Sequence, residues 1–120
     1  MIICTTVNDD YRVEVFSRAT KLVLVDTSRG VIHVEDNPAL QSTNRRPTVA
    51  KRCVELGADV VIAPHGSICY PSYRILKQHN VKVYVTEPGL DLSSISAIPL
   101  NHWEVFYSSI IAMLERLSGY

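Results

Sequence analysis

The sequence predicts an α/β fold in one domain, residues 1–120, built on a mixed sheet of five strands. The first observation is a set of short apolar runs rich in β-branched residues, which are typical of strands. These runs span residues 1–7, 21–27, 31–36, 59–63 and 81–86. The second observation is that the later runs alternate with segments of helical spacing, which favours parallel strands joined by right-handed crossovers.

The first three runs predict a strand followed by a hairpin. Residues 21–27 and 31–36 are separated only by Ser28, Arg29 and Gly30. Gly30 supplies the positive φ that so short a turn needs. Residues 11–16 alternate polar and apolar side chains, and we expect a short extended segment there.

Proline and glycine mark the first two predicted helices. Pro47 suits the first turn of a helix at 47–56, and Gly57 suits its left-handed end. Pro71 opens a second helix that runs to His79, where Asn80 can end it. Residues 87–99 follow the last strand and are expected to be irregular.

A third helix is predicted to run to about residue 118, with Asn101 and Glu104 as a capping box at its start. Its large apolar residues recur at helical spacing and mark one face. They are Trp103, Phe106, Tyr107, Ile110, Met113, Leu114 and Leu117. We expect this face to be buried in the core; the alternative is that part of it pairs with another subunit in a homodimer.

Composition excludes several classes of function. Twelve basic residues balance twelve acidic ones, so no overall basic field exists to hold nucleic acid or an anionic membrane. The apolar runs are much shorter than a membrane span, and the N-terminus does not resemble a signal peptide. We therefore expect a cytoplasmic protein in which the three cysteines are reduced.

These elements predict the strand order 3-2-1-4-5, with the hairpin at one edge and helices on both faces. In such sheets, ligands bind beyond the carboxyl ends of the strands, near the point where the strand order reverses. Here that place is formed by residues 6–10 and 65–69. The loop HGSIC therefore lies where a site is expected.

Three segments resemble the dinitrogenase iron-molybdenum cofactor biosynthesis family, and the resemblance covers roughly residues 1–86. They are VFSRATKLVLVD (15–26), VEDNPA (34–39) and GADVVIAPHGSICYPSYRILKQHNVKVYV (57–85). The family's usual His-Phe-Gly-Arg-Ala motif reads Val15-Phe16-Ser17-Arg18-Ala19 here, so its histidine and first glycine are replaced. The resemblance implies a ribonuclease H-like fold, in agreement with the predicted strand order.

The resemblance also implies a function. It indicates a non-enzymatic accessory or carrier protein for a metal–sulfur cluster precursor of iron–sulfur or iron–molybdenum type, with cluster-assembly proteins as partners. Because Val15 replaces the family histidine, His65 and Cys69 are the candidate metal ligands. The proposed ligand-binding set is Ser17, Arg18, His65, Gly66, Ser67 and Cys69.

The residues alone leave other hypotheses open. A closed metal site needs four ligands, and Cys4 and Cys53 both lie at positions expected to be core. Cys69 with His65 as its base would instead make a nucleophilic enzyme. Gly66 and Ser67 before a helix suit either an anion or an ordinary turn. An interaction module acting through the C-terminal helix is a further alternative, whereas the scattered acidic residues do not suit a two-metal nuclease.

Overall fold

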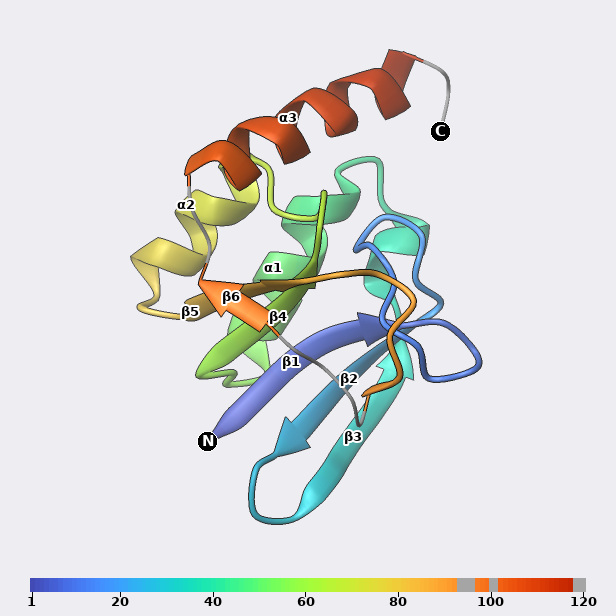
Figure 1. Ribbon diagram of the computed structural model, residues 1–120, viewed down its shortest axis with the longest axis vertical. Helices are drawn as coiled ribbons and strands as arrows, with labels where there is room; N and C mark the ends of the chain where they lie inside the picture. The colour runs from blue at the N-terminus through green and yellow to red at the C-terminus, as the bar shows by residue number, and fades with distance from the viewer. Residues whose placement is uncertain (93–96, 100–101, 118–120) are drawn as a thin grey trace.

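A mixed sheet forms the centre of the structure, a computed structural model that describes residues 1–92, 97–99 and 102–117 (Figure 1). Its strands are β1 (Ile2–Val7), β2 (Lys21–Asp26), β3 (Gly30–Asp36), β4 (Val60–Pro64), β5 (Lys82–Thr86) and β6 (Ala97–Pro99). They are arranged in the order β3-β2-β1-β4-β5-β6. The predicted order of the first five strands is therefore confirmed. The sixth strand corrects the expectation that 87–99 is irregular, because β6 pairs antiparallel with β5.

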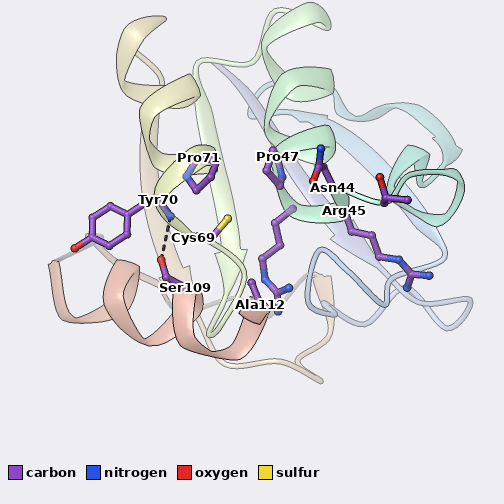
Figure 2. A pocket seen from close by; sticks show the side chains of 10 residues that line it. Asn44, Arg45, Pro47, Cys69, Tyr70, Pro71, Ser109 and Ala112 are labelled. Atoms are coloured by element: carbon purple, nitrogen blue, oxygen red, sulfur yellow. Dashed lines mark hydrogen bonds between the residues drawn. The ribbon is translucent and has the colours of Figure 1, made fainter. Parts of the chain in front are cut away.

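The predicted helices are present with small shifts at their ends. They are α1 (Arg45–Glu55), α2 (Tyr70–Gln78) and α3 (His102–Leu117), and the chain also forms a short 3-10 helix, η1 (Pro38–Gln41), that was not predicted. Pro47 and Pro71 lie in the first turns of α1 and α2, and both turns border one pocket (Figure 2). No helix in the described ranges is long and apolar enough to cross a membrane.

Local backbone geometry follows the predicted breaks. Gly30 and Gly57 both have a φ of +80°, and Asn80 has a φ of +57°, so all three occupy the left-handed region. The segment at 11–16 is extended only locally, through isolated bridges of Val13 with Val7 and of Arg12 with Asp91. Asn101 of the predicted capping box lies outside the described residues.

The two faces of the sheet are covered differently. One face carries the main core, in which Cys4, Leu22 and Leu24 of the sheet pack with apolar residues from α1, α2 and α3. On the other face Val7, Val13 and Val23 pack against Leu90 and Leu92, which belong to loops. The expectation of helices on both faces is therefore wrong for the described residues. Both crossovers, β3-α1-β4 and β4-α2-β5, run in the same direction along the sheet, so right-handedness places their helices on one face.

A disulfide between Cys4 and Cys53 joins β1 to α1 across this core. Both residues are fully buried, as the apolar pattern predicts, and their Cα atoms are 5.9 Å apart. That separation lies within the range that a disulfide requires. The expectation that all three cysteines are reduced is thus wrong for two of them, and Cys69 is the free cysteine. Sequence spacing did not indicate that two core positions 49 residues apart face one another.

We expect the alkylated mass of the denatured protein to show one free thiol before reduction and three after it, because only Cys69 is free. Reduction should also lower the free energy of unfolding by about 4 kcal/mol, since it opens a loop of this length in the unfolded chain. Intact-mass spectrometry and urea unfolding measure the two effects. Three free thiols before reduction would contradict the assignment.

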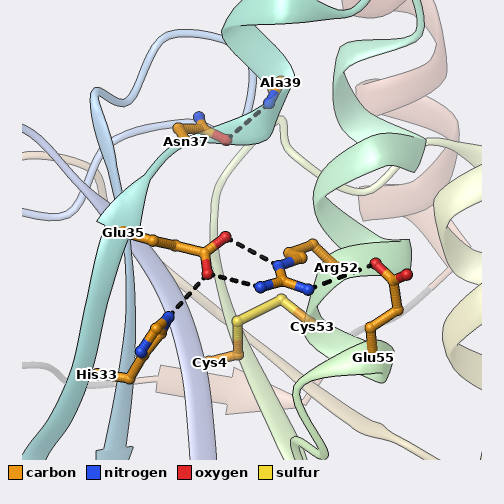
Figure 3. A network of polar contacts seen from close by, with 8 residues as sticks. All are labelled: Cys4, His33, Glu35, Asn37, Ala39, Arg52, Cys53 and Glu55. Atoms are coloured by element: carbon orange, nitrogen blue, oxygen red, sulfur yellow. Dashed lines mark hydrogen bonds and ion pairs between the residues drawn. A yellow bond between two sulfur atoms is a disulfide. The ribbon is translucent and has the colours of Figure 1, made fainter.

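An ion-pair network ties β3 to α1 on the same side of the sheet (Figure 3). Arg52 donates from Nε and Nη2 to the two carboxylate oxygens of Glu35, at 2.9 Å each. Nε2 of His33 lies 2.7 Å from Oε1 of Glu35. The hydrogen bonds from Arg52 lower the pKa of Glu35 below its ordinary value of 4.5; desolvation opposes this shift, and His33 adds to it.

We expect Glu35→Gln to destabilise the protein at neutral pH and to do so less as the pH falls below about 4.5. A carboxyl group with a lowered pKa in the folded state contributes stability above its unfolded pKa, and this contribution is lost as the pH falls through the folded pKa. Urea unfolding at about pH 7 and about pH 3 measures the difference. Glu55→Gln is the control, because Glu55 is 60% exposed and lies 3.9 Å from Arg52. An equal loss of stability at both pH values would contradict the assignment.

Candidate functional site

The loop that follows β4 is held from both sides by helices. Gly66 has a φ of +91° and is buried, and its N–H donates to Oε1 of Glu104 on α3 at 2.9 Å. Its carbonyl accepts a hydrogen bond of 2.9 Å from Nε of Arg46 on α1. Both side chains are more than nine-tenths buried, so the loop is fixed by two desolvated charged groups.

His65 is the residue of this loop that is presented outward. Its Nδ1 lies 2.6 Å from Oε2 of Glu104, and its ring stacks on Tyr107 with centroids 4.2 Å apart and an interplanar angle of 17°. The side chain is 45% exposed. Within the described part of the chain, Nε2 has no hydrogen-bond partner. A carboxylate that binds one imidazole nitrogen and leaves the other open is the arrangement seen behind metal-ligating histidines.

The segment 16–19 lies against the same loop. The N–H of Phe16 donates to Oγ of Ser67 at 3.2 Å, and Nη1 of Arg45 donates to the carbonyl of Ser17 at 3.0 Å. Asn37 also holds the segment 16–19 in place, because its Nδ2 donates hydrogen bonds to the carbonyls of Phe16 and Ala19. The structure therefore brings together the two segments that the sequence analysis joined into one site.

The predicted site residues differ in what a ligand can reach. Ser17 and Ser67 are fully buried, and the Ser67 hydroxyl already accepts an internal hydrogen bond. Arg18 and His65 are exposed. Gly66 is buried and gives both its backbone groups to the helices. The serines and the glycine thus shape the loops, whereas the histidine and the arginine face solvent.

Cys69 lies on a different side of the loop. It is the N-cap residue of α2, is 6% exposed, and has its Sγ 3.3 Å from Oγ of Ser72. It lines a pocket of about 190 Å³ between the first turns of α1 and α2 and the middle of α3 (Figure 2). The N–H of Tyr70 donates to Oγ of Ser109 across the same region. His65 does not line this pocket, so the two predicted metal ligands have different surroundings.

In the part of the chain that the structure describes, the acidic, histidine and cysteine side chains do not gather into a closed metal site. Among the described residues, no group of three or more such side chains is placed to hold an ion. His65 is paired with Glu104, and Cys69 with Ser72. Among the residues that the structure places, His65 and Cys69 are therefore single candidate ligands and not parts of a complete coordination shell.

Several residues of the site were missed by the sequence analysis. Glu104 was assigned to a helix cap and Tyr107 to an apolar stripe, while Arg45 and Arg46 were not among the proposed site residues. One sequence signal could have pointed to Glu104. Residues 105–114 contain no charged residue, so the acidic Glu104 directly before them stands out as a residue with a particular role. The contacts of these residues with the site loops join segments that are far apart in the chain, and no local sequence pattern predicts such contacts.

The fold and the loops define a small α/β protein with its candidate site at the carboxyl ends of parallel strands, where such sheets bind ligands. The chain belongs to the dinitrogenase iron-molybdenum cofactor family, which it matches over residues 1–96. Its resemblance to that family, inferred from the sequence, is thereby confirmed.

Two solved structures share the fold. One is the apo form of the orange protein from Desulfovibrio gigas, with a TM-score of 0.64 and 19% identity over 98% of this chain and 88% of that one. The other is a putative NifB protein from Thermotoga, with a TM-score of 0.56 and 22% identity over the same shares of the two chains. At these identities the likeness concerns the fold alone. No curated protein matches the chain.

We expect neutral His65 to carry its proton on Nδ1, because Glu104 accepts a hydrogen bond there. Nitrogen chemical shifts from long-range proton–nitrogen NMR spectra at alkaline pH distinguish the two tautomers. Glu104→Gln should weaken this preference, while His79, whose Nδ1 lies 2.9 Å from the carbonyl of Ile75, serves as an internal reference. A proton on Nε2 of His65 in the wild type would contradict the geometry.

Proposed function

We propose that this protein is a non-enzymatic accessory or carrier protein that binds a metal–sulfur cluster precursor, or a related anionic ligand, beyond the carboxyl ends of the central strands. The observation that supports it most is the exposed imidazole of His65, which is held by Glu104 with Nε2 open. Family membership supports the link to cofactor assembly.

The geometry suits a carrier of a preformed cluster. A cluster precursor brings its own sulfides, so it needs only a terminal ligand from the protein, and imidazole nitrogen is a good ligand for iron. A single ligand also allows release to the next protein, whereas a closed set of four protein ligands is typical of permanent structural sites. Exposed Arg18, from the neighbouring segment, is the group that would balance the negative charge of the cargo.

The alternative of a cysteine-dependent enzyme has less support. A nucleophile and its base must lie within hydrogen-bond reach of each other. Here Nδ1 of His65 is taken by Glu104, and the thiol of Cys69 lies against Ser72.

The carrier proposal also implies partners. They are cluster-assembly proteins, which would donate the cargo to this protein and accept it from this protein.

The test is anaerobic incubation with ferric iron and sulfide, followed by desalting, metal analysis and visible absorption spectra. We expect the wild type to retain iron with sulfide-to-iron charge-transfer bands, and His65→Ala to lose most of it. His79→Ala is the matched control, since His79 is also exposed but lies at the end of α2. It should bind like the wild type.

The same assay on Cys69→Ser separates the two candidate ligands. We expect this variant to keep its iron, because Cys69 lines the helical pocket and not the exposed edge. Loss of iron in Cys69→Ser with retention in His65→Ala would overturn the assignment to His65. Absence of iron from the wild type would overturn the carrier proposal itself.

A further inference from the structure

The apolar stripe of α3 is largely exposed instead of buried in the core, which overturns the expectation drawn from its spacing. Figure 1 shows α3 lying beyond α1 and α2. The large apolar residues of the stripe have exposed fractions between 37% and 53%, and they are Phe106, Tyr107, Ile110, Met113 and Leu114. Tyr107 belongs to this stripe and also contacts the candidate site, because its ring stacks on that of His65. We therefore ask what this contact does for the imidazole.

The backbone of His65 is fixed on both sides of the side chain. Its N–H donates to the carbonyl of Thr86 on β5 at 2.8 Å. The next residue, Gly66, is held by hydrogen bonds from its N–H to Glu104 and from Arg46 to its carbonyl. The remaining freedom is rotation about the two side-chain bonds of His65. An imidazole that is 45% exposed would sample several rotamers if nothing else restrained it.

Two contacts from α3 restrain this rotation. The contact of 2.6 Å between Nδ1 of His65 and Oε2 of Glu104 fixes one atom of the ring, but the ring can still turn about that atom. The stack on Tyr107, with centroids 4.2 Å apart and an interplanar angle of 17°, fixes the plane of the ring. The two contacts together determine the direction in which Nε2 points. Since a metal binds imidazole in the plane of the ring, this direction decides where a bound metal lies.

The tyrosine is placed for this role by the helix and by the loop. Glu104 and Tyr107 are three residues apart on α3, so they lie on the same side of the helix and reach the same imidazole. The tyrosine ring also covers the backbone of Gly66, because a Cβ atom added there would lie 3.5 Å from Cε1 of Tyr107. The ring thus contacts the side chain of one loop residue and the backbone of the next.

We propose that Tyr107 is a positioning residue, whose ring fixes the plane of the His65 imidazole so that Nε2 is offered to the cargo in one direction. This inference rests on the proposed function, because it takes the cargo as the ligand of Nε2. An imidazole that is already ordered loses little further freedom when the cargo binds. Ordering a mobile side chain on binding weakens affinity about three- to tenfold, which is the effect expected when the stack is removed.

NMR of the protein without cargo tests the positioning directly. We expect the His65 ring of the wild type to show restricted motion in carbon-13 relaxation and upfield-shifted ring protons, because an aromatic ring lies over it. Tyr107→Phe should keep both signals, and Tyr107→Ala should lose both. Leu114→Ala is the matched control, since Leu114 is 53% exposed on the same helix, and it should leave the His65 signals unchanged.

Hydrogen exchange at the Gly66 amide separates this role from a merely structural one. That amide is bonded to Glu104, so its protection reports whether α3 is still docked on the loop. We expect Tyr107→Ala to keep this protection, because Tyr107 is 43% exposed and the bond from Gly66 does not depend on it. Loss of protection would show that Tyr107 holds the helix and not the imidazole, and would overturn the proposal.

Iron retention against a competing chelator, after incubation with ferric iron and sulfide, measures the consequence for the cargo. Tyr107→Ala should bind iron about three- to tenfold more weakly than the wild type, and Tyr107→Phe should bind like the wild type. An ordered His65 ring in Tyr107→Ala, or unchanged iron binding, would overturn the proposal. A wild type without iron would instead overturn the carrier function, and the NMR comparison would still decide whether Tyr107 positions the ring.

Discussion

The buried carboxylate of Glu104 fixes both the candidate site and the position of the last helix. It accepts a hydrogen bond from the backbone of Gly66 and holds the imidazole of His65, so it joins α3 to the loop after β4. A carboxylate that is 8% exposed must keep such partners, because an unpaired buried charge is strongly unfavourable. The rotation of α3 about its axis follows from this requirement, and with it the direction in which its apolar side faces.

The N-terminus of α1 supplies the second constraint. Arg45 and Arg46 are adjacent, so their side chains leave the helix about 100° apart and reach different neighbours. Arg45 binds the carbonyl of Ser17, and Arg46 binds the carbonyl of Gly66. One helical turn therefore sets the separation of the two loops that form the site. Asn37 completes the frame, since it is buried and holds the carbonyls of Phe16 and Ala19.

Much of the fold could be predicted from the sequence, because its signals are local. The β-branched runs, the prolines in the first turns of α1 and α2, and Gly30 and Gly57 determined the elements, and the handedness of the crossovers gave their order. The short strand β6 could not be predicted, since Ala97–Pro99 carries no strand pattern and depends on the neighbouring edge of β5. The disulfide and the role of Glu104 were missed for a related reason: each depends on residues far apart in the chain. The burial of α3 was predicted wrongly because apolar spacing shows which side of a helix is apolar but not which way that side points.

The family match ends at residue 96, whereas Glu104 and Tyr107 lie beyond it. The imidazole thus belongs to the shared part of the chain, and the groups that orient and stack on it belong to the part that follows. A substitution of Tyr107 in α3 can alter the orientation and exposure of His65 while the sequence of the strands and of the two loops stays the same. The C-terminal helix therefore lies outside the family match and still forms one wall of the candidate site, so the site joins a shared scaffold to a segment particular to this chain.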